Sequence, residues 1–207
     1  MIGDNVYVFG GSTLISGGWF SNSLNTTMIY NVSTGVTTYG ANMPNGVVAQ
    51  SCVKAANGSI RVIGGYNHSS ASYLRIVQIY NPATNSWSKN ANLAPVTLGL
   101  SAAVLGTDGR VYIFGGGWTE NTMIIYNPAA DSWAYGADVP YRTWGSSAVT
   151  YSSTEILPIG GANVILGDVT DEVAVYNPVA DSWRFVSSMN IAKGYSNAVL
   201  ARNGCSP

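Results

Sequence analysis

The stretch Val111–Trp133, VYIFGGGWTENTMIIYNPAADSW, holds in one copy the pattern that decides the fold. A β-branched and aromatic run ends at a pair of glycines, where the backbone can adopt positive φ or approach a neighbour closely. A second apolar run then leads into Tyr126-Asn127-Pro128, a tight-turn sequence in which proline fixes φ. Trp133 follows seven residues after Tyr126.

The same pattern occurs four times with a spacing of about 50 residues, which is typical of a repeat architecture. The glycine pairs are Gly10-Gly11, Gly64-Gly65, Gly115-Gly116 and Gly160-Gly161. The tyrosines are Tyr30, Tyr80, Tyr126 and Tyr176. The tryptophans are Trp87, Trp133 and Trp183, and the first copy has Thr37 at that place. Repetition of this kind predicts a fold and says little about chemistry.

Each copy is expected to form four short antiparallel strands. In the third copy, strands are predicted over 100–105, 110–114 and 123–126, with a fourth that begins at Ser132. Tyr and Trp side chains each bury roughly 150–250 Å² when packed, so one sheet alone cannot cover them. Stacking the sheets face to face around an axis places the rings between neighbouring sheets. The small residues Ser101-Ala102-Ala103 suit the strand closest to that axis.

The glycine pair at a strand end, the Tyr-Asn-Pro turn and the later tryptophan resemble the kelch repeat, and the match covers nearly the whole chain. This resemblance implies an all-β fold, a β-propeller of four-stranded antiparallel blades like that of the galactose oxidase type, with four blades by count. The first copy departs from the pattern, with Val32 in place of proline and Thr37 in place of tryptophan. Its outer strand should therefore pack more loosely.

The organisation expected is a single propeller over residues 1–207. Because the chain starts at a second strand and ends with a first strand over 195–200, the resemblance implies that one blade is closed by both termini. The predicted blades are 189–204 with 4–43, about 44–93, about 94–139, and about 140–189. Since the family usually has more than four blades, three alternatives stand: a closed four-blade ring, a fragment of a larger ring, or a homodimer that shares one ring. An unclosed ring would expose apolar blade faces that favour dimerisation.

The composition disfavours several classes of protein. Charged residues make up 9% of the chain and the net charge is −1, so no basic stripe is present to bind nucleic acid. No apolar run is long enough to span a membrane, and Met1–Asn5 lacks the features of a signal peptide. Low charge and many Asn, Ser and Thr residues suggest an extracellular protein. Cys52 is interpreted as a small buried hydrophobic residue, and a disulfide to Cys205 is not expected.

Candidate binding residues lie in the loops, because variable loops on a rigid scaffold usually carry function. The resemblance to kelch modules that capture peptides implies contacts directly after the glycine pair and in the turn before the inner strand. The first set of positions is Ser12, Tyr66, Gly117 and Ala162, and the second is Val47, Thr97, Thr143 and Lys193. The candidate residues of this loop face are Tyr66, Arg142, Trp144, Trp118, Trp19, His68, Asn163, Lys193 and Tyr195.

Each aromatic candidate has a packing alternative. Trp19 could cap its own long loop, and Trp118 and Trp144 could pack against each other. Arg142 could be a solvated loop residue. Tyr66 is the preferred contact, because tyrosine combines a large contact area with a hydrogen bond at low entropic cost.

No catalytic residue, metal ligand or cofactor is predicted. A copper site of the galactose oxidase type needs two histidines, and the chain has only His68. Its arginines fall at different repeat phases, unlike the converging arginines of sialidases. The acidic loop 167–172 lacks EF-hand-like spacing and is interpreted as a solvated loop.

The leading hypothesis is a non-catalytic module that binds a protein or peptide on one loop face. The alternative is an extracellular module that binds or modifies carbohydrate, since exposed Trp and Tyr rings stack well on sugars. A third reading is a structural one, in which the chain is a propeller segment within a larger adhesive or multidomain chain.

Overall fold

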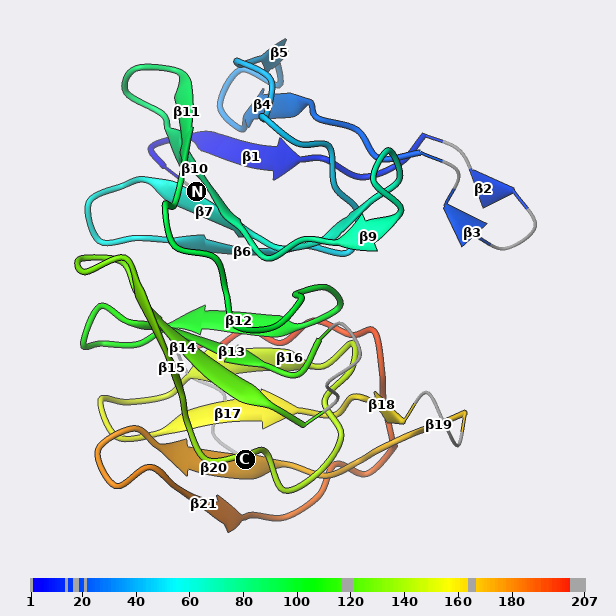
Figure 1. Cartoon of the computed structure of the whole chain (residues 1–207), viewed down its shortest axis with the longest axis vertical. Coiled ribbons are helices and arrows are strands. Elements are labelled where there is room, and N and C mark those ends of the chain that lie inside the picture. Colours follow the sequence, from blue (N-terminus) through cyan, green and yellow to red (C-terminus); the bar gives the residue numbers. More distant parts are fainter. Residues whose placement is uncertain are drawn as a thin grey trace. The chain divides into compact units, whose positions relative to one another are not determined.

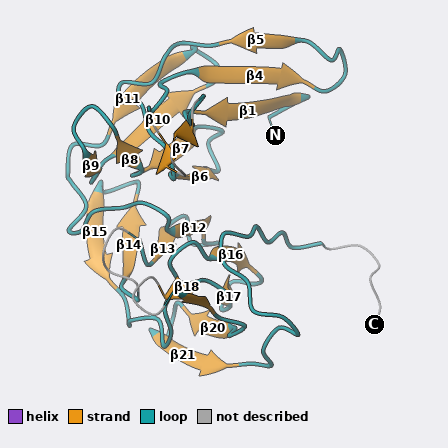
Figure 2. Cartoon of the chain, turned by 90° about the vertical axis from the view of Figure 1, so that its right-hand side faces the viewer, coloured by secondary structure: helices purple, strands orange, loops and turns teal. Residues whose placement is uncertain are grey.

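The computed structural model describes residues 2–13, 15–16, 19–20, 22–116, 121–163 and 167–201, with only the backbone described for 15–16 and 19–20. This part of the chain consists of strands, turns and loops (Figure 2), and it contains no helix that could cross a membrane. The chain divides into two compact units, Met1–Gly99 (unit 1) and Leu100–Pro207 (unit 2).

Unit 1 contains a three-stranded and a four-stranded antiparallel sheet, together with two short hairpins (Figure 1). The three-stranded sheet has the order β1 (Asn5–Phe9), β4 (Thr27–Asn31), β5 (Thr37–Tyr39). The four-stranded sheet has the order β6 (Ser51–Lys54), β7 (Ile60–Ile63), β10 (Val77–Asn81), β11 (Ser86–Lys89). The hairpins are β2 (Ile15–Ser16) with β3 (Trp19–Phe20), and β8 (Tyr66–Asn67) with β9 (Ser72–Tyr73).

Unit 2 contains two four-stranded antiparallel sheets and one hairpin. The first sheet has the order β12 (Ala102–Leu105), β13 (Val111–Phe114), β14 (Met123–Asn127), β15 (Ser132–Tyr135). The second has the order β16 (Ser147–Thr150), β17 (Ile156–Ile159), β20 (Ala174–Asn177), β21 (Ser182–Phe185). The hairpin is β18 (Ala162–Asn163) with β19 (Asp168–Val169). The Oγ1 of Thr150 donates a hydrogen bond of 2.9 Å to the carbonyl oxygen of Leu105, which joins the inner strands of the two sheets.

The strands predicted for the third copy are confirmed as β12 to β15. In each four-stranded sheet the repeat tyrosine lies directly opposite the repeat tryptophan, in the pairs Tyr80–Trp87, Tyr126–Trp133 and Tyr176–Trp183. The three tyrosines are buried and the three tryptophans are half-buried. The all-β prediction of four-stranded antiparallel blades with aromatic rings packed inside is therefore confirmed.

A repeated hydrogen-bond network, which we call the latch, joins the two sheets of unit 1. The indole Nε1 of Trp87, on β11, donates to the carbonyl oxygen of Ala41, which follows β5. The backbone N–H of Ala41 donates to Oδ1 of Asn85 at 2.7 Å, and the hydroxyl of Tyr80 donates to the same oxygen at 2.8 Å. Trp87 and Asn85 thus hydrogen-bond to both the carbonyl oxygen and the N–H of Ala41, which follows the last strand of the neighbouring sheet.

Unit 2 has the same latch with one chemical difference. Trp183 Nε1 donates to the carbonyl oxygen of Ala137 at 2.8 Å, just as in unit 1. The acceptor for the Ala137 N–H and the Tyr176 hydroxyl is now the carboxylate of Asp181, at 2.8 and 2.7 Å. Both hydrogen bonds favour the ionised carboxylate, so they lower the pKa of Asp181 below its ordinary value of 3.8.

The Asp181→Asn substitution is expected to reduce the acid sensitivity of unit 2 while keeping the latch. A carboxylate whose pKa is lowered on folding adds stability above its ordinary pKa, and this contribution is lost as pH falls through the lowered folded value. Asparagine at position 181 has no such titration, and Asn85 shows that an amide fits. The measurement is the urea midpoint at neutral pH and at about pH 3.

The matched control for this prediction is Asn85→Asp, which should introduce acid sensitivity into unit 1. Asp108 also has a lowered pKa: burial raises it, but hydrogen bonds from Tyr112 and Arg110 outweigh that effect. Some acid destabilisation therefore remains in Asp181→Asn. An unchanged difference between the two midpoints would contradict the role assigned to Asp181.

The first copy is the least covered, in line with its missing tryptophan. Strand β5, which begins at Thr37, is exposed at all three positions. The segment 195–200, predicted as the inner strand of the first sheet, has no strand partner in the structure. Closure of that sheet by both termini, and the organisation of 1–207 as one ring, stay predictions.

The interpretation of Cys52 as a buried residue was wrong. Cys52 lies on the inner strand β6, in which Val53 is the one buried residue. Cys52 and Lys54, on either side of Val53, point to the opposite face of the strand. Cys52 is a free cysteine and is exposed to solvent, although the protein atoms around its thiol raise the pKa of that group to about 12. Cys205 lies outside the described residues.

Candidate functional site

In three of the copies, the second glycine of the repeat motif holds its loop against the turn that leads into the next inner strand. Its N–H donates to the carbonyl oxygen of the turn that precedes the following inner strand. The observed pairs are Gly11 with Val47 at 2.8 Å, Gly65 with Leu98 at 2.7 Å and Gly161 with Lys193 at 2.8 Å. The residue after the glycine pair therefore lies beside that turn. In these copies, the two sets of positions implied by the kelch resemblance are close to each other.

In unit 1 the predicted residues Tyr66 and His68 lie together. Their rings meet edge to face with centroids 5.0 Å apart, and Tyr66 meets Tyr73 in the same way at 5.2 Å. The backbone of Tyr66 exchanges hydrogen bonds with Val48, at 2.7 and 3.0 Å. Both Tyr66 and His68 are half-buried. His68 is thus held in an aromatic cluster of the β8–β9 hairpin, and Tyr66 retains a partly open face.

In unit 2 the predicted residues Trp144 and Tyr195 form a second aromatic cluster. Their ring centroids are 5.7 Å apart and the rings are nearly perpendicular. Trp144 forms a bridge with Ala162, the residue after the glycine pair, and the N–H of Tyr195 donates to the carbonyl oxygen of Gly145 at 2.7 Å. Tyr195 is exposed and Trp144 is half-buried. The aromatic partner of Trp144 in the described chain is therefore Tyr195.

The predicted residues Trp19 and Trp118 cannot be placed in either cluster. Strand β3 pairs the backbone of Trp19 with Ser16, but the side chain of Trp19 lies outside the described residues. Trp118, together with Gly117, lies outside them entirely. The alternatives weighed for these two tryptophans stay predictions.

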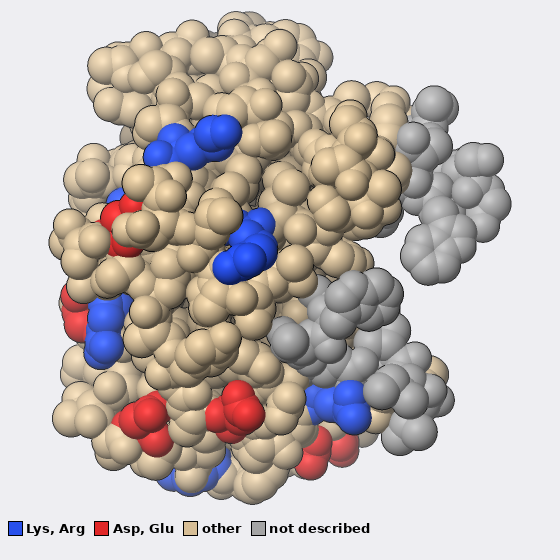
Figure 3. All heavy atoms as spheres, viewed as in Figure 1, with Lys and Arg blue, Asp and Glu red and all other residues tan. Residues whose placement is uncertain are grey.

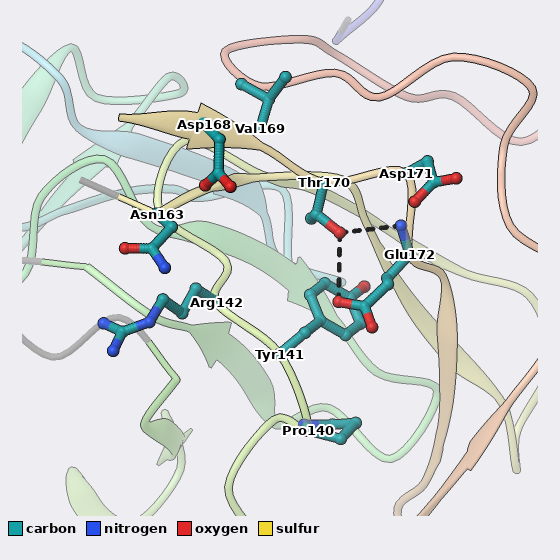
Figure 4. Close-up of a pocket in the computed structure, with 9 residues that line it drawn as sticks. All are labelled: Pro140, Tyr141, Arg142, Asn163, Asp168, Val169, Thr170, Asp171 and Glu172. Atoms are coloured by element: carbon teal, nitrogen blue, oxygen red, sulfur yellow. Dashed lines mark hydrogen bonds between the residues drawn. The ribbon is translucent and has the colours of Figure 1, made fainter. Parts of the chain in front are cut away.

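A polar cavity of about 410 Å³ lies beside the second cluster in unit 2 (Figure 4). It is lined by Pro140, Tyr141, Arg142, Asn163, Asp168, Val169, Thr170, Asp171 and Glu172. Figure 4 shows Arg142, Asn163 and Asp168 on one side of the view, Asp171 and Glu172 on the other, and Thr170 between them above Tyr141. The cavity thus joins two residues predicted for the loop face, Arg142 and Asn163, with the acidic loop.

The walls of this cavity are held by specific hydrogen bonds. Tyr141 is buried, its hydroxyl donates to the carbonyl oxygen of Pro158 at 2.7 Å, and burial raises its pKa. Thr170 Oγ1 donates to Glu172 Oε2 and accepts from the Glu172 N–H, both at 3.1 Å. The N–H of Lys193 donates to the Thr170 carbonyl oxygen at 3.0 Å. Because its pKa is raised, Tyr141 stays neutral at physiological pH.

The acidic loop does not form a metal site in the described structure. Across residues 2–116, 121–163 and 167–201, with the short gaps at 14, 17–18 and 21, no three His, Cys, Asp or Glu side chains converge on one point. The carboxylates of Asp168, Asp171 and Glu172 instead line a space wide enough for an organic group. Their chemistry there is to accept hydrogen bonds, while Arg142 and Asn163 can donate them.

Sequence reasoning missed Tyr141 and Thr170 as parts of this site. Neither stands at a distinctive repeat position, and their proximity results from the hairpin β18–β19 folding back over the turn at Pro140. On the face shown in Figure 3, acidic and basic residues are few and scattered among uncharged ones.

Comparison with known proteins supports the repeat assignment. The kelch motif matches residues 50–93. The chain is 33% identical over 76 residues to Kelch-like protein 31 of Danio rerio, covering 37% of this chain and 12% of that protein. It is 30% identical over 79 residues to N-acetylneuraminate epimerase of Pasteurella multocida (strain Pm70), covering 37% of this chain and 21% of that protein. The chain thus spans less than a quarter of the length of these curated relatives.

A solved structure shows the same fold over nearly the whole chain. The structure of YjhT superimposes with a TM-score of 0.72 and 19% identity, covering 94% of this chain and 65% of that one. At this identity the likeness concerns the fold alone. Four copies of the glycine-pair motif, sheets of four antiparallel strands and the matching motif and fold lead to one conclusion: the chain carries the kelch motif and has a β-propeller fold.

Proposed function

We propose that the chain is a non-catalytic binding module that recognises a protein or peptide at the loop ends of its sheets. The observation that carries this proposal is the polar cavity of unit 2, which Arg142 and Asn163 line together with the carboxylates of Asp168, Asp171 and Glu172. A peptide backbone presents both carbonyl acceptors and N–H donors. A cavity that is lined by both hydrogen-bond donors and acceptors suits such a ligand.

The aromatic clusters support the same function. Trp144 is only two residues from Arg142 and bridges to Ala162, the neighbour of Asn163, so the cluster of Trp144 and Tyr195 adjoins the cavity. Aromatic residues and arginine are the residue types that contribute most to protein interfaces. Unit 1 offers Tyr66 in an equivalent loop, with part of its ring open to solvent.

The Arg142→Ala substitution is expected to weaken peptide binding about tenfold or more, the effect of losing a central charged donor. The probe is a peptide selected on the immobilised full chain from a phage-displayed random library, and its affinity is measured by isothermal titration calorimetry. Arg142 is exposed, so its loss should leave the fold unchanged.

The matched control is Arg184→Ala. Arg184 is an exposed arginine of the outer strand β21, where it pairs with Glu155, outside the cavity. This variant should bind the selected peptide like the wild type. Equal affinity of the wild type and Arg142→Ala for every selected peptide would rule out the cavity as the binding site.

Recognition of an acidic carbohydrate is the second candidate. It is favoured by the similarity to a protein named for N-acetylneuraminate, a sugar acid whose carboxylate could pair with Arg142 in the cavity. Titration of free N-acetylneuraminate, with a glycan array alongside, distinguishes the two ligands. An enzymatic role would further require turnover of that sugar, which nuclear magnetic resonance spectra of the mixture would reveal.

A further inference from the structure

Unit 1 contains an open cavity of about 570 Å³ between the turn that precedes β6 and the β8–β9 hairpin, which Figure 2 labels. The polar residues that line this cavity carry amides or hydroxyls and are Asn45, Asn67, Ser69, Ser70 and Ser72. None of the described residues that line it is charged. We call this space the serine cavity.

The serine cavity stands at the same repeat position in unit 1 as the cavity of Arg142 does in unit 2. The second and fourth copies of the repeat have the same spacing from the turn before the inner strand to the repeat tyrosine. The corresponding residues that line the two cavities are Pro44 and Pro140, Asn67 and Asn163, Ser72 and Asp168, and Leu74 and Thr170. The repeat therefore forms a cavity at this position twice, with different side chains.

Equivalent backbone hydrogen bonds hold the two cavities. The N–H of Leu74 donates to the carbonyl oxygen of Gly65 at 2.8 Å, and the N–H of Thr170 donates to that of Gly161 at 2.9 Å. The carbonyl oxygens of Leu74 and Thr170 each accept an N–H at 3.0 Å from the loop that follows the outer strand. Both cavities thus result from the repeated backbone, and the side chains decide what each can bind.

A network of hydrogen bonds fixes the polar groups of the serine cavity. Asn67 is 7% exposed, and its Nδ2 donates to the carbonyl oxygen of Gly46 at 2.7 Å. Its Oδ1 accepts from the N–H of Ser70 at 2.8 Å. The hydroxyl oxygens of Ser70 and Ser72 are 2.9 Å apart. The hairpin and the turn are therefore joined, and the two serine hydroxyls have defined positions.

Asn45 contributes a buried acceptor whose hydrogen-bonding capacity is unused. Gln78 holds its backbone, since the N–H of Asn45 donates to Gln78 Oε1 at 2.8 Å and its carbonyl oxygen accepts from Gln78 Nε2 at 3.1 Å. The side-chain Oδ1 of Asn45 is buried and has no hydrogen-bond partner among the described protein groups. A buried acceptor without a partner is costly, so a donor from a bound molecule would stabilise it.

We propose that the serine cavity is a second binding site of this chain and that its ligand is an uncharged sugar. A sugar hydroxyl both donates and accepts hydrogen bonds, so it complements serine hydroxyls and asparagine amides. Pro44 and Leu74 add apolar surface for the C–H groups of a sugar ring. The volume lies within the range of about 300–1,000 Å³ that is usual for small-molecule sites.

The charges of the two cavities separate their ligands. Three carboxylates and the guanidinium of Arg142 line the unit 2 cavity, whereas Ser72 stands in unit 1 where Asp168 stands in unit 2. A charged group would lose its hydration in the serine cavity without gaining an opposite charge from the lining residues. The sugar site is therefore independent of the peptide binding proposed for Arg142.

The test begins with an array of uncharged saccharides, probed with the full chain, and continues with calorimetric titration of the saccharide that is retained most strongly. Asn45→Ala removes the buried acceptor and should weaken this binding about tenfold or more. The matched control is Asn42→Ala, an exposed asparagine of the same loop that does not line the cavity, which should bind like the wild type. Arg142→Ala should also keep the wild-type affinity, which separates this site from the one in unit 2.

A measurement on the wild type guards against a variant that fails to fold. When the same saccharide is added, the nuclear magnetic resonance shifts of the backbone amides should change in 45–46 and 67–74 and stay constant in 141–142 and 168–172. Retention of no uncharged saccharide, shift changes confined to the unit 2 segments, or wild-type affinity in folded Asn45→Ala would each overturn the proposal.

Discussion

The Gly64→Ala substitution is expected to unfold unit 1, with a loss of about 4 kcal/mol or more in the free energy of unfolding. Gly64 has a φ of +60°, where a side chain costs about 1–3 kcal/mol. A Cβ at this position would also lie 2.3 Å from the carbonyl oxygen of Leu98. That oxygen accepts the hydrogen bond of the Gly65 N–H at 2.7 Å, so it cannot move without breaking the loop contact.

The matched control is Gly58→Ala. Gly58 also has a positive φ, +82°, but a Cβ there would meet no atom within 4 Å. This variant should lose only about 1 kcal/mol, the cost of the backbone conformation. Urea unfolding of the full chain followed by circular dichroism gives both values. Similar losses for the two variants would show that close approach to the next sheet is not what the glycine pair provides.

Repetition is the reason that so much of the fold could be predicted from the sequence. Four copies of one pattern place glycine pairs, tyrosines and tryptophans at corresponding positions. The glycine pairs indicate strand ends, the tyrosines indicate buried rings, and the tryptophans indicate outer strands. Even the departure at Thr37 predicted the exposed strand β5. Cys52 was predicted wrongly because a four-residue strand of small and apolar residues does not reveal which of its faces is covered.

The candidate site could be predicted only in part. Arg142 and Asn163 were found because they lie near repeat positions that face the loops. Their meeting with Thr170 and Glu172 depends on how one irregular loop folds back, and no repeat pattern constrains that path. The grouping of Tyr66 with Tyr73 has the same origin, since it is made by the β8–β9 hairpin inserted between repeat strands.

Removing the indole of Trp183 is expected to destabilise unit 2 by about 3 kcal/mol. The ring of Trp183 packs against Phe114 of the neighbouring sheet and Tyr176 of its own, with centroids 5.9 and 5.0 Å away. Its Nε1 also closes the latch on Ala137. Trp183→Ala therefore removes the apolar contact and the hydrogen bond between two sheets together.

Two further variants separate these contributions. Trp183→Phe keeps most of the apolar contact and leaves the Ala137 carbonyl without its donor, so it should cost about 1 kcal/mol. Phe185→Ala removes a ring two residues along the same strand that is 59% exposed, and it should change stability by about 0.5 kcal/mol at most. Circular dichroism is the suitable probe, because tryptophan fluorescence changes with the substitution itself. If Trp183→Ala were as stable as Phe185→Ala, the repeat tryptophan would not join the sheets, and its regular recurrence would need another physical cause.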